Sequence, residues 1–418
     1  MSTSTPTLRI GLFGFGTVGE SLYQVLRQTP TLRGDIQTVV IKHPEKPRNA
    51  PAHLFTTDPD AILTDETLNV VVELIDDADA AYQIVKTALQ NGKAVVSANK
   101  KMIAEHLDEL LYLQRTHQVP FLYESAACAS IPVIRNLEEY YDNDLLHGLQ
   151  GIVNGSTNYI LTRMAREGLS FEAALKQAQN AGFAESDPSL DVNGIDAVNK
   201  LTILLAHAYG IVGSPNDLVH SGIQHLHPQD AVVAREKGYV IKLIAQARKL
   251  TNGQVAAFVL PQFVPAHHLL APVSNEYNGV IIESGLAENQ FFYGKGAGGI
   301  ATASAVLSDL SALRYGYRYE YKKRYNQEPG ELSNDFYVRL QVTFSGRQPI
   351  PNRLFEQIEE YTCTGRYTTV VGILHFAKLL DTSWWQNPQT SLVLCPDPIL
   401  EILPEAADTL APAEYAVA

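Results

Sequence analysis

The sequence predicts an α/β fold, with a first domain on a parallel sheet, an α+β domain after it, and a small α/β module near the C-terminus. Apolar runs of strand length alternate with helix-like segments over residues 8–125, which is the pattern of βαβ units. A glycine-rich turn joins the first run to the first helix. The 418 residues, of which 45% are hydrophobic, are enough for two or three domains.

The first strand, residues 8–13, runs directly into the glycine-rich turn, and a helix follows at residues 20–28. Gly14 permits the tight turn, Gly16 lets the backbone approach a pyrophosphate, and Gly19 allows close packing of helix on strand. The free amides at the helix N-terminus suit phosphate charge. This context predicts a Rossmann-like domain with a nicotinamide cofactor site rather than a merely structural turn. The residues of that site are Gly14, Phe15, Gly16, Thr17, Val18 and Gly19.

The end of the second strand, residues 36–42, bears on the choice of cofactor. In enzymes that prefer NAD, an acidic residue at this position binds the ribose hydroxyls. Here the position falls near Lys42. Glu45 follows, but Lys46 and Arg48 lie beside it, and such a basic pocket suits the 2'-phosphate of NADP. The alternative is an ordinary charged loop. The sequence therefore favours NADP over NAD, with Lys42 as a cofactor-binding residue.

The other strands of the first domain are expected at 69–75, 93–99 and 120–125, and its other helices at 78–92 and 100–117. Right-handed crossovers make these strands parallel, so a ligand lies at their carboxyl ends. The loops there contain Asp76, Asp77, Lys100 and Glu124. Lys100 opens a helix, where a cation opposes the helix dipole. We therefore expect a local anion beside Lys100, at the nicotinamide end of the cofactor.

The second domain is expected to mix helices and strands. Helices are expected at 131–144, 159–167 and 300–313, and strands near 255–260 and 278–284. The polar turn 154–158 precedes one of these helices and can cap it. The glycine run 294–299, GKGAGG, precedes another and allows close approach of a backbone or a cofactor edge.

Residues 318–330 are charged, rich in tyrosine and end in Pro-Gly, which is typical of a linker. Beyond them we expect strands at 336–344, 368–376 and 390–395, and helices at 352–361 and 377–385. This alternation predicts a small α/β module, and the residues from Pro404 on are expected to be loose. The predicted domains are 1–135 with a return segment at about 294–318, then 136–320, then 331–403.

The stretch 182–200, GFAESDPSLDVNGIDAVNK, concentrates charge inside an apolar region. Its charged residues are Glu185, Asp187, Asp191, Asp196 and Lys200. Asp196 and Lys200 stand at i and i+4 on one face of the helix that follows. An exposed ion pair is the alternative interpretation, since such pairs are common on helices. The run of leucine and isoleucine after Lys200 predicts a buried helix instead, where an ion pair is costly unless it has a function.

Composition limits the classes of function. A net charge of -13 and a pI near 5.4 argue against nucleic acid as a partner. The cysteines Cys128, Cys363 and Cys395 form no CxxC pair, which fits a reducing compartment and no structural zinc. The polar N-terminus resembles no signal peptide, and no apolar run approaches the roughly 20 residues that span a bilayer. We therefore expect a soluble cytoplasmic protein that does not bind membranes.

Six segments, in this order, resemble homoserine dehydrogenases over roughly residues 8–315. They are GLFGFGTVG, VVSANK, YESAACASIP, NGSTNYIL, GFAESDPSLDVNGIDAVNK and FFYGKGAGGIATASAVLSDL. The resemblance implies NAD(P)-dependent interconversion of L-homoserine and L-aspartate 4-semialdehyde, in the biosynthesis of threonine, methionine and isoleucine. It also implies a homodimer formed by the α+β domain. The chain would cross back at GKGAGG, where Gly296 would bind the cofactor.

Site residues are carried over by position. Glu185 and Asp191 match substrate-binding residues of the family. Asp196 and Lys200 match the pair assigned to substrate binding and proton transfer. Lys100 matches the lysine of the family's ANK motif, which reaches the same reacting oxygen.

The chemistry of an alcohol dehydrogenase agrees with these residue types. Oxidation of a primary alcohol needs a hydride acceptor and a base that takes the hydroxyl proton, and a lysine can be that base. Lys200 is the candidate and Lys100 could share its role, because the sequence does not rank them. Acidic side chains suit the substrate's ammonium group. Asn154 and Thr157 could supply polar groups for the substrate's carboxylate.

The resemblance also implies a sodium ion near Glu124, held by the main-chain carbonyls of Ala127, Ala129 and Ile131. Three features depart from the family pattern. Asp76-Asp77 replaces paired glycines, residues 126–130 replace a glycine-rich loop, and the C-terminal module lacks the usual effector loop. That module is either a divergent ligand-binding module of the ACT type or a structural addition.

Two other functions are compatible with the glycine motif. One is an aldehyde dehydrogenase that forms a thioester on a cysteine, for which Cys128 is the only candidate near the site. No histidine in a suitable motif accompanies it, so a small packed residue is the better interpretation. The other is a non-catalytic dinucleotide sensor, which has no need for the lysines and acidic residues of the site.

Overall fold

The computed structural model describes residues 7–143, 145–346 and 354–404. The chain divides into two compact units. The first comprises Met1–Asp144, Thr202–Pro215 and Gly294–Pro329, and the second comprises Leu145–Leu201, Asn216–Tyr293 and Gly330–Ala418.

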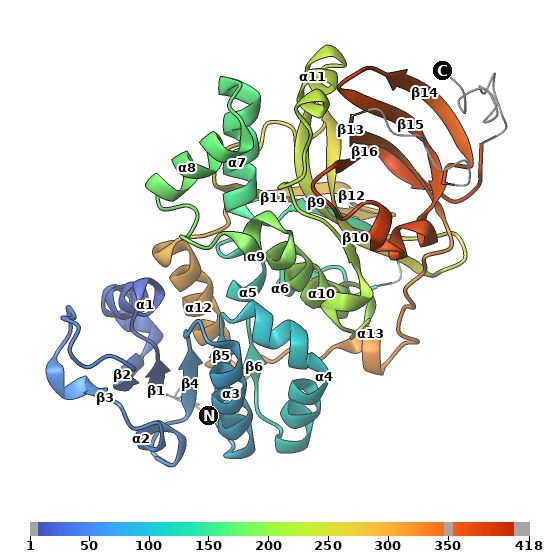
Figure 1. The fold of residues 1–418 in the computed structure, drawn as a ribbon. Coiled ribbons are helices and arrows are strands. Elements are labelled where there is room, and N and C mark those ends of the chain that lie inside the picture. The colour runs from blue at the N-terminus through green and yellow to red at the C-terminus, as the bar shows by residue number, and fades with distance from the viewer. Residues whose placement is uncertain (1–6, 144, 347–353, 405–418) are drawn as a thin grey trace. The chain divides into compact units, whose positions relative to one another are not determined.

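The first unit contains a six-stranded sheet in the order β3-β2-β1-β4-β5-β6 (Figure 1). Its strands are β1 (Leu8–Phe13), β2 (Gly34–Val40), β3 (Phe55–Thr56), β4 (Val70–Glu73), β5 (Ala94–Ser97) and β6 (Phe121–Leu122). All neighbouring pairs are parallel, which confirms the predicted fold class. The order reverses between β1 and β4, and open parallel sheets bind ligands at such a point.

The helices of this unit are α1 (Thr17–Gln28), α2 (Asp60–Leu63), α3 (Ala78–Gln90), α4 (Lys100–His117), α5 (Ser125–Cys128), α6 (Val133–Glu139), α12 (Gly299–Leu313) and α13 (Lys322–Tyr325). Short 3-10 turns lie at Pro30–Leu32 and Ala52–Leu54. Helices α3 and α4 pack on each other, and α12 packs on both α1 and β5. The chain therefore returns to the first unit at the GKGAGG segment.

The glycine turn after β1 has the geometry that a nucleotide loop needs. Gly14 has φ +92°, and a Cβ there would lie 2.6 Å from the main-chain oxygen of Leu74. A Cβ at Gly19 would lie 2.4 Å from the main-chain oxygen of Gly14. A Cβ at Gly16 would meet nothing within 4 Å. Packing within the protein therefore requires the first and third glycines, whereas the second leaves open space for a ligand.

Residues 318–330, predicted to be a linker, end where the chain passes from the first unit to the second, between Pro329 and Gly330. Tyr319 and Tyr321 are 1% and 2% exposed, and Lys323 is buried as well. The hydroxyl group of Tyr321 forms a hydrogen bond with the hydroxyl group of Tyr123, which is buried in the core of the first unit. Alternate side chains of residues 319–323 are buried, a period-2 pattern that the charged residues between them obscure, so this part packs in the first unit. Residues 325–329, which follow, are exposed.

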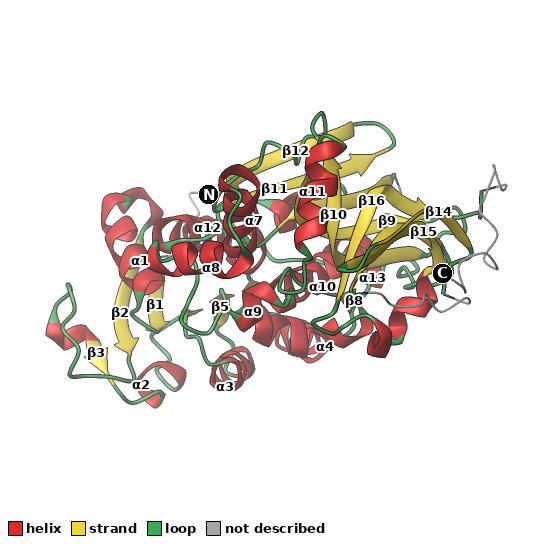
Figure 2. Ribbon diagram, turned by 45° about the horizontal axis from the view of Figure 1, so that its top comes forward, coloured by secondary structure: helices red, strands yellow, loops and turns green. Residues whose placement is uncertain are grey.

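The second unit contains a ten-stranded sheet with the path β12-β11-β7-β9-β10-β16-β13-β15-β14, and β8 pairs with β10 (Figure 2). The strands are β7 (Leu146–Ile152), β8 (Val219–His220), β9 (Tyr239–Lys249), β10 (Val255–Pro265), β11 (Tyr277–Ser284), β12 (Glu288–Lys295), β13 (Tyr337–Ser345), β14 (Gln357–Cys363), β15 (Tyr367–His375) and β16 (Thr390–Leu400). The helices are α7 (Gly155–Glu167), α8 (Phe171–Asn180), α9 (Ser189–Val192), the first part of α10 (Ile195–Tyr209), and α11 (Pro228–Glu236).

The C-terminal strands continue this sheet. The expected helix over 352–361 is wrong, because β14 occupies Gln357–Cys363 and pairs antiparallel with β15. The 3-10 turns Phe376–Leu380 and Thr382–Trp384 stand where a short helix was expected. Phe258 of β10 shares one hydrophobic cluster with Phe336 and Phe376. The described residues beyond 330 are therefore strands that pair antiparallel with one another, with two 3-10 turns, on a shared core, and not an α/β alternation. The segment from Pro404, expected to be loose, lies outside the described residues from residue 405 on.

Candidate functional site

The charged stretch 182–200 folds into the short helix α9, a glycine turn and the long helix α10. Gly194 in the turn has φ +81°, and a Cβ there would lie 2.7 Å from the main-chain oxygen of Ser221. A larger residue would be strained in this turn. Asp196 and Lys200 consequently stand one turn apart on α10, as their spacing predicted.

Asp196 and Lys200 form a buried ion pair. Nζ of Lys200 lies 2.8 Å from Oδ2 of Asp196, and it donates to the main-chain oxygen of Val153 at 2.7 Å. The side chains of Lys200 and Asp196 are 9% and 4% exposed. The alternative of an exposed surface pair is therefore wrong. A buried pair carries a desolvation cost, and such groups concentrate at functional sites.

Asn154 links this pair to a second carboxylate. Its Nδ2 donates to Oδ2 of Asp196 at 2.8 Å and to Oδ1 of Asp191 at 2.6 Å. Its Oδ1 accepts from the main-chain N and the hydroxyl of Thr157, at 2.8 and 2.9 Å, so Asn154 is also the N-cap of α7. Five predicted residues thus form one cluster, which we call the Lys200 network: Asn154, Thr157, Asp191, Asp196 and Lys200.

The Lys200 network has an excess of negative charge. Asp191 and Asp196 each carry a carboxylate, and Lys200 supplies one ammonium group, so the formal charge of the cluster is -1. Charges in a partly desolvated site interact more strongly than they do in water. The network therefore favours a ligand that carries a positive charge.

Glu185 is not part of this network. It is exposed, and its main-chain oxygen accepts from Nε2 of Gln179 at 3.0 Å. Within the described residues its carboxylate makes no hydrogen bond or ion pair. Its substrate-binding role stays a prediction.

Lys100 is the first residue of α4, at the carboxyl edge of the first unit's sheet. The preceding Asn99 caps that helix, because its Oδ1 accepts from the main-chain N of Met102 at 3.0 Å. Asp77, which stands where the resemblance predicts glycine, is the N-cap of α3 and accepts from the main-chain N of Ala80 at 3.0 Å. Asp77, one of the two residues that replace the family's paired glycines, therefore caps the start of α3.

A hollow of about 510 Å³ lies beyond the end of β2. Lys46 and Arg48 line it, whereas Lys42, the predicted cofactor residue, does not. The guanidinium of Arg48 donates to the main-chain oxygens of Lys46 and His43, at 2.7 and 2.6 Å, and lies 5.4 Å from the ring centre of Phe55. Of the three cations that were predicted to form a basic pocket, Lys46 and Arg48 therefore line this hollow and Lys42 does not.

The glycine run before α12 lies close to the nucleotide loop. Gly296 is buried. A Cβ at Gly299 would lie 2.6 Å from Oγ of Ser21 and 2.8 Å from the main-chain oxygen of Thr17. The start of α12 consequently packs directly against the first turn of α1, the helix that begins at the predicted pyrophosphate site.

Glu124 serves the start of α6. Its Oε1 and Oε2 accept from the main-chain N atoms of Ile134 and Arg135, at 2.9 and 2.8 Å. Its own main-chain N donates to Oδ2 of Asp309 at 2.9 Å, and Arg135 pairs with Oδ1 of Asp309 at 2.8 Å. Burial, with repulsion from Asp309, raises the pKa of Glu124 to about 8. The Glu124 carboxyl therefore already accepts hydrogen bonds from two main-chain amides.

We expect Glu124→Gln to remove part of the pH dependence of stability. In the folded protein the carboxyl has a pKa of about 8, whereas in the unfolded chain it is about 4.3. The folded state therefore holds an extra proton between these values, so stability falls as pH rises through this window. Thermal unfolding between about pH 5 and about pH 9 should show a steeper fall of Tm for the unchanged protein than for the variant. Equal slopes would contradict this assignment.

The loop after Glu124 has an unusual backbone. Ala129 has φ +45°, in the left-handed region that favours glycine, and the main-chain oxygen of Ile131 accepts from Val133 N at 2.9 Å. In the part of the chain that the structure describes, no group of three or more His, Cys, Asp or Glu could hold a metal ion. A cation in this loop would therefore depend on main-chain oxygens. Cys128, in the same loop, is fully buried, as predicted for a small packed residue.

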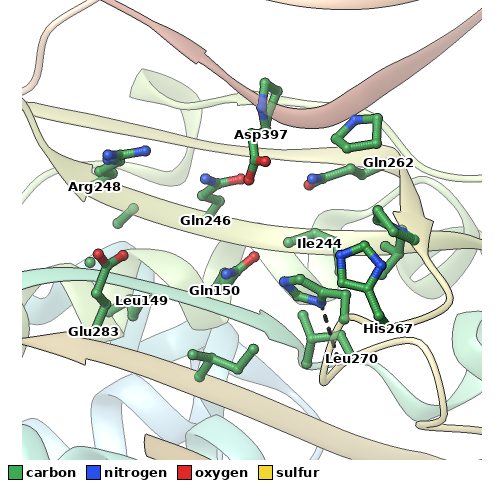
Figure 3. A pocket seen from close by; sticks show the side chains of 18 residues that line it. Leu149, Gln150, Ile244, Gln246, Arg248, Gln262, His267, Leu270, Glu283 and Asp397 are labelled. Carbon is green, nitrogen blue, oxygen red and sulfur yellow. Dashed lines mark hydrogen bonds between the residues drawn. The ribbon is translucent and has the colours of Figure 1, made fainter. Parts of the chain in front are cut away.

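A second hollow, of about 230 Å³, lies on β7, β9 and β10. Figure 3 shows Asp397 pointing toward Gln246, with Gln262 on the same side of the pocket. None of the residues of the Lys200 network lines it.

Sequence reasoning also missed Glu73, which is fully buried at the end of β4. A carboxylate that ends the otherwise apolar strand VVVE is the signal that could have found it.

The comparisons with known proteins agree on one family. Residues 14–124 match the family model described as homoserine dehydrogenase, NAD binding domain, and residues 132–311 match the one described as homoserine dehydrogenase. A homoserine dehydrogenase from Synechocystis sp. is 37% identical over 314 residues, which are 73% of this chain and 72% of that protein.

Solved structures show the same likeness. A homoserine dehydrogenase from Thiobacillus denitrificans has a TM-score of 0.81 at 27% identity, over 94% of this chain and 99% of that one. A hyperthermophilic archaeal homoserine dehydrogenase in complex with NADPH has a TM-score of 0.64 at 25% identity, over 75% of this chain and 99% of that one.

The parallel sheet and the two matching family models together define a dinucleotide-dependent oxidoreductase. No helix within the described ranges has the length and apolar character to cross a membrane. The chain belongs to the homoserine dehydrogenase family and is an NAD(P)-dependent oxidoreductase.

Proposed function

We propose that the chain interconverts L-homoserine and L-aspartate 4-semialdehyde, in the biosynthesis of threonine, methionine and isoleucine, and that the Lys200 network binds the substrate. The observation that carries this proposal is the buried Lys200–Asp196 pair with Asn154 and Asp191 beside it. The formal charge of -1 suits the ammonium group that both substrates carry. Asp191 and Glu185 are the proposed partners of that group. Asn154 and Thr157 are proposed for the substrate's carboxylate, which would replace a present acceptor of their donors, such as Asp191 or Asp196 at Asn154 Nδ2.

Lys200 is the proposed acid and base. Its ammonium group has three N–H donors, of which Asp196 and the main-chain oxygen of Val153 take two. The third can donate to the reacting oxygen of the substrate. In the reduction the group stabilises charge on that oxygen and gives it a proton, and in the oxidation the neutral amine takes the hydroxyl proton. Lys100 is proposed to reach the same oxygen.

The nicotinamide ring, when bound, supplies the hydride acceptor or donor. The chain's part is to hold the cofactor. Residues 14–19, together with Gly296, are proposed to cradle the phosphates, because the open space at Gly16 and the start of α1 fit a pyrophosphate.

The assay that tests this function follows the absorbance of the reduced cofactor. Reduction of NADP or NAD should depend on added L-homoserine, and L-aspartate 4-semialdehyde should drive the reverse reaction. If neither substrate changes the absorbance in a folded sample that binds the cofactor, the proposed reaction is wrong.

NADP is the proposed cofactor, in preference to NAD. Lys46 and Arg48 line the hollow beyond β2, and Lys42 lies two residues after the last residue of that strand. Cations here would contact the 2'-phosphate, which only NADP carries. A relative whose structure holds NADPH supports the same choice.

We expect Arg48→Ala to lower kcat/KM for NADP by about 10- to 100-fold, because a charge-assisted contact to phosphate contributes about 1.5–3 kcal/mol. The value for NAD should stay within about 2-fold, since NAD has no group for this residue to bind. Steady-state kinetics with both cofactors measures the two values. Arg27→Ala, which removes an exposed arginine of α1 that does not line the hollow, is the matched control. Equal losses for both cofactors would show that Arg48 only supports the fold.

Three further parts of the family pattern are proposed. A sodium ion would be held by the main-chain oxygens of Ala127, Ala129 and Ile131 near Glu124, although two amides already occupy the Glu124 carboxylate and Val133 N occupies Ile131. Activity in sodium compared with tetramethylammonium salts would test it. A homodimer is also proposed from the resemblance, and sedimentation would measure it. A cytoplasmic location is the third proposal.

A further inference from the structure

Glu73 is a buried carboxyl at the point where the sheet order reverses. Its neighbours in register are Phe13 on β1 and Ser97 on β5. The side chain is 0% exposed, and it has no ion-pair partner within the described residues. The proposed reaction gives it no role. A carboxyl in this position is costly to bury, so its hydrogen bonds indicate what it does.

The hydrogen bonds of Glu73 join two loops. Oε1 accepts from the main-chain N of Ile75 at 2.7 Å, and Oε2 accepts from the hydroxyl of Ser97 at 2.5 Å. The Ser97 hydroxyl in turn accepts from the main-chain N of Asn99 at 3.1 Å. Asn99 closes the ring, because its Nδ2 donates to the main-chain oxygen of Ile75 at 3.1 Å. The loop after β4 and the loop after β5 are therefore joined twice, through the Glu73 carboxyl and through the hydrogen bond from Asn99 to Ile75.

Both loops border the proposed cofactor site. The main-chain oxygen of Leu74 lies 2.6 Å from where a Cβ of Gly14 would be, so the first loop packs directly against the glycine turn. The second loop ends at Asn99, which caps α4, and Lys100 is the next residue. The carboxyl of Glu73 therefore holds in place the loop that packs against the glycine turn. It also holds the start of α4, the helix that carries Lys100.

We propose that Glu73 is a positioning residue, which holds Lys100 in the arrangement that hydride transfer requires. This inference rests on the proposed role of Lys100. Burial raises the pKa of Glu73 to about 7. The ionised carboxyl accepts from the Ser97 hydroxyl, and the neutral carboxyl can either accept from it or donate to it, so the link between the loops persists on either side of neutral pH.

Four variants test this proposal by steady-state kinetics with L-homoserine and NADP. Glu73→Ala and Ser97→Ala should each lower kcat by about 10- to 100-fold, because a displaced group loses the benefit of orientation. The KM for L-homoserine should change by less than about 3-fold, since the Lys200 network is intact. Glu73→Gln should recover kcat to within about 3-fold, because its amide can accept from Ile75 and donate to Ser97.

Val72→Ala is the matched control, since Val72 is fully buried on the same strand but takes no part in the ring of hydrogen bonds. It should lower Tm and leave kcat unchanged. If Val72→Ala lowers kcat as much as Glu73→Ala does, the effect is general loss of structure and the proposal is wrong. Failure of Glu73→Gln to recover kcat above Glu73→Ala would also overturn it.

A double-mutant cycle with Lys100→Ala separates this proposal from the one on which it rests. If Glu73 acts through Lys100, adding Glu73→Ala to Lys100→Ala should lower kcat by less than about 2-fold more. Fully additive losses overturn the proposal. Wild-type kcat in Lys100→Ala removes the proposed role of Lys100 and this inference with it. Wild-type kcat in Glu73→Ala beside an impaired Lys100→Ala overturns the role of Glu73 alone.

Discussion

Lys200→Ala should lower kcat by about 10³-fold, with the affinity for the cofactor unchanged. General acid–base catalysis by one positioned group contributes about 10²- to 10⁴-fold, and Lys200 is the proposed group. The loss also leaves Asp196 buried without its cation, which adds a cost in stability of about 3–5 kcal/mol. Initial rates at saturating L-homoserine measure kcat. Fluorescence titration with the reduced cofactor measures its Kd, and Tm shows that the variant is folded.

Lys242→Met is the matched control for this prediction. Lys242 is also a buried lysine of the second unit, and its Nζ donates to Asn158 and to the main-chain oxygen of Val273, at 2.9 and 2.5 Å. Burial lowers its pKa to about 8. Its replacement should change Tm and leave kcat within about 3-fold, because it has no proposed part in proton transfer. Near-normal kcat in Lys200→Ala would exclude Lys200 as the acid and base.

Asn154→Asp should lower kcat/KM for L-homoserine by about 10²-fold, and it should also lower Tm because the new carboxylate is buried without a cation. The new carboxylate can still accept from Thr157, so the N-cap of α7 is kept. It cannot donate to Asp191 and Asp196, and it puts a third negative charge beside these two. The loss corresponds to about 2.7 kcal/mol at about 1.36 kcal/mol for each tenfold change.

Asn154→Ala and Asn158→Ala complete this test. The first removes both the N-cap and the link between the carboxylates, so Tm and kcat/KM should both fall. The second removes a buried asparagine of the same helix, whose Nδ2 donates to main-chain oxygens at Val273, Asn275 and Tyr277. It should lower Tm alone. Loss of kcat/KM in proportion to Tm across all three variants would mean that Asn154 serves only the fold.

The parts that the sequence predicts well are those where a local pattern has one physical solution. The glycine turn needs a tight backbone at Gly14 and close packing at Gly19, and both occur. Helix α4 begins and ends where predicted, at Lys100 and His117, because an asparagine cap opens it. The i,i+4 spacing of Asp196 and Lys200 likewise predicted the ion pair.

The failures come from information that local patterns lack. Residues 352–361 have spaced apolar side chains that also suit a helix, yet an open edge of the sheet beside β15 makes part of them the strand β14. The double role of Asn154 was not predictable, because its two carboxylate partners lie 37 and 42 residues along the chain. Glu73 was missed since its partners become neighbours only once β4 and β5 pair.

A crystal structure of the protein with L-homoserine and NADP bound tests the central claim most directly. We expect the substrate hydroxyl within hydrogen-bond distance of Nζ of Lys200, and the substrate ammonium group against Asp191. The 2'-phosphate should lie beside Lys46 and Arg48. L-Homoserine bound away from the Lys200 network, with Lys200 still paired to Asp196 and touching no ligand, would contradict the proposed site.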